Sequence, residues 1–237
     1  MKAHRILAIF EKDVKEFMRN MSLFTMILLP IIMALLFSNI NIGAEGQGLP
    51  LEIILMLIGM TFSAISYNTM ATMIAEENEK ETLRGLVQSP ATLLDIILGK
   101  SLVASLMTLV SLIISLAICQ SLTNWSFAAI IATLLLLMFF LCLGIAVGLT
   151  VKSVATTAVY TMPIMFVFGM SQYIEFIIID PSHPARKLFN FLPIYQLYFI
   201  AQGKKVGQAF LILIIWLILI FSLVIYAFKR QANDDKS

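Results

Sequence analysis

Charged side chains are scarce in this chain. Asp, Glu, Lys and Arg make up 13% of its 237 residues, whereas a soluble domain carries about 25%. Hydrophobic residues make up 60%. This composition is typical of an integral membrane protein, and the length leaves no room for a soluble catalytic domain beside the apolar segments.

Residue patterns for catalysis and metal binding are also scarce. The two cysteines, Cys119 and Cys142, fall in apolar stretches, so we expect buried free thiols and no disulfide. His4 and His183 would lie near opposite membrane faces, which argues against a zinc site. Gly99-Lys100-Ser101 lacks the earlier glycine of a phosphate-binding P-loop. We therefore expect no catalytic, cofactor or metal site in this chain, and no nucleic-acid partner.

Six apolar runs are long enough to cross a bilayer, since one crossing takes roughly 20 apolar residues; the third carries Asp95 and Lys100 at its inner edge. We expect an all-α membrane domain over residues 21–237 with six transmembrane helices. Their expected ranges are 21–42, 53–75, 93–118, 127–150, 154–174 and 206–228. The N-terminus lacks the apolar core and cleavage site of a signal peptide.

Lys and Arg are unevenly distributed over the connections, and cytoplasmic connections of membrane proteins are enriched in them. With the N-terminus inside, the cytoplasmic segments hold 12 of the 16. We therefore expect a plasma-membrane protein with both termini in the cytoplasm. Lys100 would lie at the inner edge of the third span, where its ammonium can extend toward the headgroups. The last outer connection holds the other four cations: Arg186, Lys187, Lys204 and Lys205.

Residues 1–20 show the spacing of an amphipathic helix. Ile6, Phe10 and Phe17 recur on one side, and Lys12 and Arg19 occupy the other. Basic residues beside an apolar face suit the anionic inner leaflet. We expect an interfacial helix here; the alternative is a cytoplasmic extension whose cations only fix the topology.

The outer segment 180–205 is too long for a simple turn. Within it, residues 188–201 are apolar and aromatic but too few to span, and Pro193 interrupts them. We expect short extracellular re-entrant helices before the last span. Aromatic residues suited to the outer headgroup level are Trp125, Tyr195, Tyr198 and Phe199.

A charged island separates the second and third apolar runs. Four carboxylates and two cations occur within residues 76–84, and each would cost roughly 2.5–3.5 kcal/mol at bilayer depth. The loop 76–92 must therefore lie in water, where an i, i+4 pair of Glu76 with Lys80 favours a short helix that Ser89-Pro90 ends. The residues alone leave two interpretations open: a docking helix for a soluble partner, or a solvated loop that only maintains the topology.

The island continues into a longer motif. The order Glu77-Asn78-Glu79-Lys80-Glu81-Thr82-Leu83-Arg84-Gly85-Leu86-Val87-Gln88-Ser89-Pro90, followed by Leu98-Gly99-Lys100, resembles the membrane subunits of type-2 ATP-binding-cassette exporters. That family has an acidic pair, a Gly-x-Thr-Leu, a Ser-Pro and a later Gly-Lys after the second span. This chain has Lys80 or Glu81 where glycine is common. The resemblance extends to the layout of the whole chain.

The resemblance implies that the island is a coupling helix docked on a separate ATPase subunit, which binds ATP and Mg²⁺. It also implies a pair of membrane subunits, identical or paralogous, with two ATPases that Lys2 to Lys15 would brace. Gly144-x-x-x-Gly148 would permit close packing within or between subunits. The residues expected at the ATPase contact are Glu76, Glu77, Glu79, Lys80, Glu81, Thr82, Leu83 and Arg84.

The expected function is export of an amphipathic substrate, such as a hydrophobic peptide, an antibiotic or a lipid, by a permease that is not itself an enzyme. Surfaces rich in Met and aromatic residues adapt to varied apolar ligands, although packing between helices is the alternative for each candidate. Two rival functions are an ATP-independent membrane scaffold or channel, and an ion-coupled secondary transporter that depends on Glu175. The candidate residues of the substrate path are Met26, Met33, Thr61, Ser66, Asn68, Thr69 and Glu175.

Overall fold

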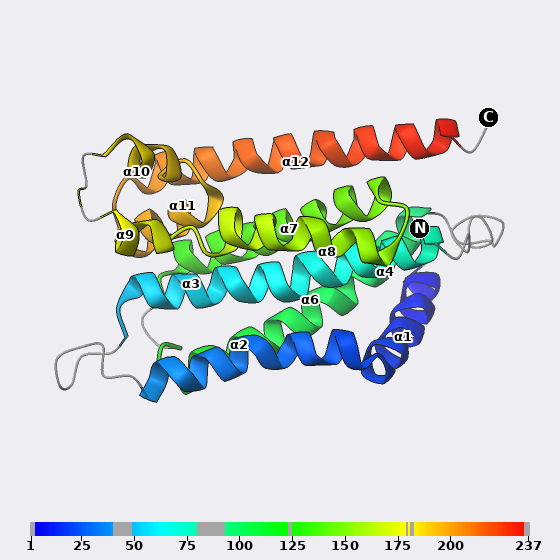
Figure 1. Cartoon of the computed structure of the whole chain (residues 1–237), viewed down its shortest axis with the longest axis horizontal. Helices are drawn as coiled ribbons and strands as arrows, with labels where there is room; N and C mark the ends of the chain where they lie inside the picture. The colour runs from blue at the N-terminus through cyan, green and yellow to red at the C-terminus, as the bar shows by residue number, and fades with distance from the viewer. Residues whose placement is uncertain are drawn as a thin grey trace.

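The computed structural model describes residues 3–39, 49–79, 93–122, 125–178, 180 and 183–234. These ranges form helices joined by short turns, with no strand among them, which confirms the all-helical prediction. Most of the long helices run side by side along the long axis, and helix α1 lies across one end of the bundle (Figure 1). We call this the α1 end. Both termini of the chain lie there (Figure 1).

The N-terminal segment forms two helices with a sharp bend between them. Helix α1 covers Ala3–Arg19, and α2 covers Met21–Asn39. The segments Ile6–Arg19 and Leu23–Asn39 meet at an angle of 71°. At the bend, Asn20 Oδ1 accepts a hydrogen bond from the Leu23 backbone N–H at 3.4 Å, as a residue at a helix start commonly does.

One continuous helix runs through the middle of the bundle, and we call it the central helix. It comprises α3 (Leu51–Thr61), a π-helical segment η1 (Phe62–Tyr67) and α4 (Asn68–Glu79). The expected second span, 53–75, therefore continues without a break into the island. Residues 76–79 form the last turn of α4; the remainder of the expected coupling helix lies outside the described residues.

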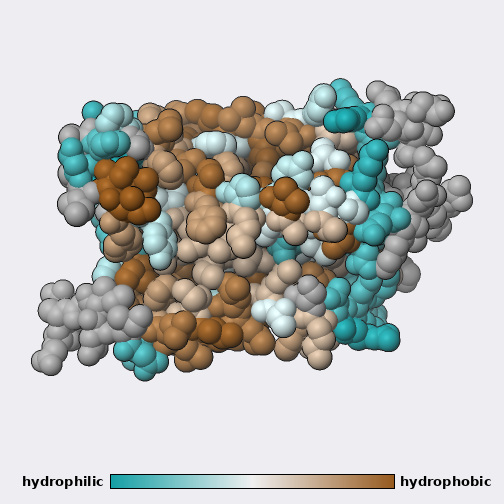
Figure 2. All heavy atoms as spheres, viewed as in Figure 1, coloured by the Kyte–Doolittle hydropathy of each residue, from teal (hydrophilic) through white to brown (hydrophobic). Residues whose placement is uncertain are grey.

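Three further long helices complete the bundle: α6 (Leu93–Ile118), α7 (Phe127–Thr150) and α12 (Val206–Asp234). Helix α6 packs along all three parts of the central helix, α7 packs on η1 and α4, and α12 packs mainly on α7. Helix α8 (Val154–Ile164) continues as a second π-helical segment, η2 (Met165–Gly169). Seen from one side, apolar side chains form a band between two polar ends (Figure 2). This band is the surface expected of a membrane protein.

The described residues contain four helices that are long and apolar enough to cross a membrane, or five if the bent pair of α1 and α2 counts as one crossing. The expected fifth span, 154–174, is shorter than predicted, because its helix ends at Gly169 in a turn. Val154–Gly169 is therefore an apolar helix below the length of a full crossing. The count of six spans stays a prediction.

The segment at the far end from α1 folds as three short helices: α9 (Tyr173–Ile177), α10 (Pro184–Phe189) and α11 (Pro193–Ala201). Pro193 does not interrupt a helix as expected; it begins α11, where its missing N–H costs nothing. Tyr195 is buried in the protein core, so its ring packs against protein and does not face the headgroups. Tyr198 instead joins α11 to the start of the central helix, because its hydroxyl lies 3.2 Å from Glu52 Oε1.

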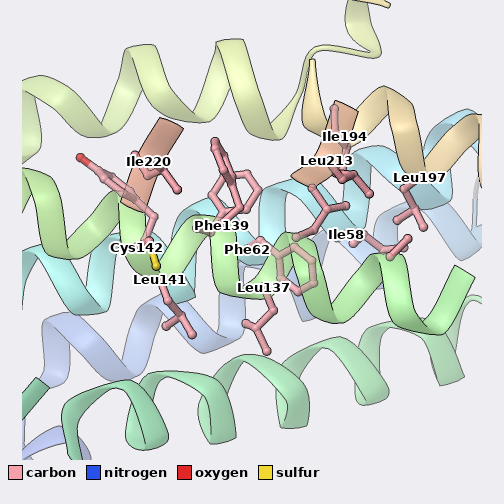
Figure 3. Close-up of a cluster of buried hydrophobic side chains, with 14 of the residues drawn as sticks. Ile58, Phe62, Leu137, Phe139, Leu141, Cys142, Ile194, Leu197, Leu213 and Ile220 are labelled. Atoms are coloured by element: carbon pink, nitrogen blue, oxygen red, sulfur yellow. The ribbon is translucent and has the colours of Figure 1, made fainter. Parts of the chain in front are cut away.

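The core lies where α7 meets the central helix, α11 and α12 (Figure 3). Phe62 packs against Phe140 with ring centroids 5.9 Å apart, and Phe139 meets Trp216 edge to face. Gly144 and Gly148 lie directly against the central helix, so this motif serves packing within the subunit. Cys119 and Cys142 are free and buried, as predicted.

Candidate functional site

The α1 end brings together helices that are distant in the sequence. Helix α1 packs on the start of α6, and Gly99 lies directly against Ile9 of α1. A Cβ at this position would lie 2.6 Å from Ile9 Cγ2, well inside van der Waals contact. Only glycine lets the two helices approach so closely. The Gly-Lys dipeptide that resembled the end of a P-loop therefore begins with a packing residue.

The lysine of the same dipeptide joins three helices. Lys100 Nζ of α6 lies 2.9 Å from Glu77 Oε1 of α4 and 3.2 Å from Asp13 Oδ2 of α1. The side chains of Lys100 and Asp13 are 3% and 0% exposed. We call Asp13, Glu77 and Lys100 the ion cluster. The prediction that Lys100 extends toward the headgroups is wrong, because its charge is neutralised inside the protein.

Apolar packing separates the ion cluster from the rest of the bundle. Phe17 of α1, Met73 of α4 and Val103 of α6 are buried together in one hydrophobic cluster, and each lies about one turn from a member of the ion cluster on its own helix. Asp95 of α6 is also fully buried. In such surroundings an ion pair is less screened than in water, and an unpaired charge is costly.

Ion pairs on the outer face of α1 differ from the ion cluster. Lys15 Nζ lies 2.7 Å from Glu11 Oε1, but both side chains are more than 70% exposed. The hydrogen bond and the charge of Lys15 lower the pKa of Glu11. Exposed pairs of this kind contribute at most about 1 kcal/mol to stability.

Asn78 ties the end of α4 to the opposite side of the bundle. Its Nδ2 donates to the carbonyl oxygen of Gly148 on α7 at 3.0 Å. Its Oδ1 accepts from Gln231 Nε2 on α12 at 2.6 Å. One side chain in the last turn of α4 thus contacts both α7 and α12.

Glu79 makes a further tie, to the start of α8. Its Oε2 accepts a hydrogen bond from the Val154 backbone N–H at 2.8 Å. A carboxylate at this position satisfies a free N–H of the first helical turn and interacts favourably with the helix dipole. Ser153 caps the same turn through the Thr156 N–H. Residues 77–79 therefore bond directly to α6, α7, α8 and α12, and they reach α1 through Lys100.

The expected ATPase-contact residues divide into two groups. Glu76, Glu77 and Glu79 lie in the last turn of α4, where Glu77 faces inward onto Lys100 and Glu79 caps α8. Lys80, Glu81, Thr82, Leu83 and Arg84 lie outside the described residues. Asp13 and Lys100 were not expected as site residues. The signal for Asp13 is its spacing of four from Ile9 and Phe17, which places a carboxylate on the apolar face of α1.

Several candidate path residues gather where the central helix meets its neighbours. Asn68 Nδ2 lies 2.8 Å from Met26 Sδ of α2, and Asn68 Oδ1 accepts from Thr161 Oγ1 of α8 at 3.0 Å. The hydroxyls of Ser66 and Thr108 are 2.9 Å apart, which links η1 to α6. We call Asn68, Met26, Thr161, Ser66 and Thr108 the polar seam.

The polar seam does not include the other candidate path residues, which are Thr61, Met33, Thr69 and Glu175. Thr61 bonds to the Leu57 carbonyl of its own helix at 2.7 Å, and Met33 packs in a separate cluster with Ala34 and Leu57. Thr69 is fully buried. Glu175 belongs to α9, but its side chain is outside the described part of the structure.

The fold and the α1 end define an all-helical membrane protein in which one buried helix ends in a charged turn at the α1 end. Comparison with known families agrees with this class. A family model described as ABC-2 family transporter protein matches residues 45–228. This range covers most of the 237 residues, so the chain belongs to the ABC-2 transporter family, whose members are transport permease subunits and generally not catalytic themselves. No curated protein matches the chain.

Proposed function

We propose that this chain is the permease subunit of an ATP-binding-cassette exporter, driven by ATP and Mg²⁺ bound to a separate ATPase subunit. The observation that carries the proposal is the continuity of the central helix. Leu51–Glu79 is one helix of 29 residues, and it leads from the far end of the bundle into the island. Because a helix is stiff, displacement of the island at the α1 end displaces side chains along the whole interior.

In this proposal the α1 end faces the cytoplasm, both termini are cytoplasmic, and α2 and the segment 154–174 complete six crossings. The distribution of Lys and Arg supports this orientation. The exposed apolar side chains of α1, among them Leu7 and Met18, support an interfacial position for α1. The charged face of α1 borders a polar groove of about 860 Å³, lined by Ala8, Glu11, Lys12, Lys15, Glu16, Arg19 and Asn20, that would face the ATPase.

The orientation is testable with a single cysteine. Cys119 and Cys142 are replaced by alanine, and Thr82 by cysteine, in whole cells. We expect a membrane-impermeant maleimide to label the Thr82→Cys variant only after the cells are opened. A cysteine in place of Lys204, in the turn before α12, serves as the control and should react in intact cells. Labelling of the Thr82→Cys variant in intact cells would contradict the proposal.

ATPase docking is tested by charge and shape changes in the part of the island beyond α4. The double variant Leu83→Asp/Arg84→Glu is co-expressed with a candidate ATPase that carries a Walker A loop. We expect at least a tenfold drop in co-purified ATPase, equivalent to about 1.4 kcal/mol. The matched control is Lys152→Glu, an exposed charge reversal between α7 and α8. Equal recovery of the ATPase with both variants would remove the coupling-helix assignment.

Glu77 is a poor choice for such a test. Its carboxylate lies against Lys100, so Glu77→Lys would place two cations together inside the protein. A loss of binding in that variant would reflect damage to the α1 end as much as a lost ATPase contact.

The proposed substrate is an amphipathic molecule that passes along the central helix, and the transporter is proposed to work as a pair of membrane subunits. The polar seam supports the path, because Asn68 and Ser66 place hydrogen-bonding groups without fixed charge inside the bundle.

The rival functions predict different behaviour. A scaffold or channel predicts assembly or conduction independent of ATP, whereas a secondary transporter predicts activity that depends on Glu175 and collapses with the proton gradient.

A further inference from the structure

Packing alone does not require charged residues at the three positions of the ion cluster. One ammonium from α6 lies between one carboxylate from α1 and one from α4, and Asp13 and Lys100 are almost fully buried. Apolar residues of the same size would fill this space without the cost of removing three charges from water. The three charges are far apart in the sequence, so they meet only when α1, α4 and α6 are assembled.

The helices around the α1 end form two groups. Helix α6 packs mainly against α1 and α2, whereas α7 packs mainly against α12 and α4. The end of α4 lies between these groups and bonds to both. It reaches the first group through Lys100, and the second through the neutral hydrogen bonds of Asn78 and the exposed cap made by Glu79.

These two sets of bonds differ in strength. The ion pair of Glu77 with Lys100 is shielded from water, so breaking it takes away one of the two carboxylates beside a buried ammonium. The bond from Glu79 to Val154 is exposed, and water can replace either partner. When the island moves, α4 is therefore expected to stay joined to α1 and α6, and to shift against α8 and α12.

We propose that Lys100 is a positioning residue for ATPase coupling, because its ammonium clamps α1, α4 and α6 into one body that moves with the island. This inference rests on the proposed function for its role in transport. The clamp itself is a property of the chain alone. The two parts can therefore be tested separately.

The clamp is tested by hydrogen exchange of the purified chain in lipid nanodiscs, without any ATPase. Lys100→Met removes the buried cation and leaves two buried carboxylates, of which Asp13 keeps the exposed Lys12 at 3.5 Å. We expect amides of α1 and of residues 76–79 to exchange on the order of tenfold faster or more, with α12 unchanged. The matched control is Lys15→Met, which removes an exposed lysine paired with Glu11 and should change exchange less than about twofold. Unchanged exchange in Lys100→Met would overturn the clamp.

A neutral triple variant covers the case in which Lys100→Met does not fold. Asp13→Asn/Glu77→Gln/Lys100→Met keeps similar shapes and leaves no charge within the ion cluster. We expect it to fold, because neutral replacement of a buried ion cluster is commonly tolerated, while α1 still exchanges several-fold faster than in the wild type. Wild-type protection of α1 in the triple variant would show that the charges are dispensable, and would also overturn the clamp.

The role in coupling is tested in the complex with the ATPase. Ser63 is fully buried on η1, so Ser63→Cys in a background lacking Cys119 and Cys142 reports opening of the bundle to a membrane-impermeant maleimide. We expect ATP to increase this labelling in the otherwise wild-type chain. In the triple variant the ATP-dependent increase, normalised to the ATPase that co-purifies, should fall about tenfold; Lys152→Met serves as the exposed control.

The outcomes separate the two proposals. If the triple variant loses protection of α1 but keeps full ATP-dependent labelling, Lys100 only stabilises the fold and its positioning role is wrong. If no ATPase co-purifies with the wild-type chain, and ATP does not change the labelling, the proposed function fails. In that case the exchange experiment still decides whether the clamp exists.

Discussion

The central helix and α12 are both long apolar helices, but they occupy opposite environments. Protein buries 94% of the residues in the most apolar window of the central helix, and only 17% of those in the corresponding window of α12. The less apolar of the two is the buried one. In a bilayer, lipid solvates apolar side chains as well as protein does, so polar residues are the ones that gain from a protein environment.

The polar residues of the two helices show the same contrast. On the central helix, Asn68 and Ser66 bond to other helices, and Glu77 pairs with Lys100. On α12, Ser222 is exposed and bonds only to the Leu219 carbonyl of its own helix. Hydrogen bonds thus join the middle of the central helix to its neighbours. Helix α12 bonds to Phe191 through Trp216 and to Asn78 through Gln231, and between them it is held mainly along one apolar face.

The largest expected difference in stability between variants of the two helices comes from removing a buried aromatic ring. Phe62→Ala removes a fully buried side chain that packs on Phe140, and we expect a loss of about 3–5 kcal/mol of stability. The control is Phe221→Ala on α12, where the ring is half exposed and the loss should be below about 0.5 kcal/mol. Unfolding in mixed micelles measures both. Equal losses of stability in the two variants would mean that the buried ring contributes no more to stability than the half-exposed one.

A smaller difference in stability is expected when one glycine of each helix is replaced by alanine. A Cβ on Gly59 of the central helix would overlap the carbonyl oxygen of Gly169, so Gly59→Ala should cost about 1–3 kcal/mol through overpacking of η2. Gly207 of α12 has open space around it, and Gly207→Ala should be neutral or stabilise the helix by up to about 1 kcal/mol. Thermal unfolding followed by size-exclusion chromatography gives the comparison. A stable Gly59→Ala variant would show that η2 can move away from the central helix.

The sequence predicts the class of fold because its strongest signals are local. Long apolar runs, two isolated cysteines and the motif after the second run lead to the helices, the free thiols and the family. The end of the fifth run at Gly169 was missed, since residues 170–174 contain nothing charged before Glu175 to mark the turn. The burial of Tyr195 was missed because α11 is apolar on several sides, and composition does not distinguish lipid from protein as its neighbour.

The ion cluster could be predicted only in part. A lysine and an aspartate on apolar faces indicate that each needs a partner, but nothing local shows which partner. Asp13 and Lys100 are 87 residues apart, and their pairing depends on the approach of α1 to α6 at Gly99. The island was expected to present all its carboxylates to a partner, whereas the fold turns Glu77 inward. The periodicity of the sequence does not reveal which polar side chains of distant helices meet, because this depends on the tertiary structure.

The smallest expected difference in stability comes from replacing a polar side chain of the polar seam. Asn68→Leu keeps the size of the side chain but removes its bonds to Thr161 and Met26, and hydrogen bonds between membrane helices contribute about 0.6–1.7 kcal/mol. We expect a loss near 1 kcal/mol, because Thr161 can still bond to the Thr157 carbonyl of its own helix. Ser222→Leu on α12 should be neutral, since it places an apolar side chain where the surface already faces lipid. If transport falls in Asn68→Leu by much more than stability does, Asn68 contacts substrate as well as α8. If both change in proportion, the polar seam serves helix packing alone.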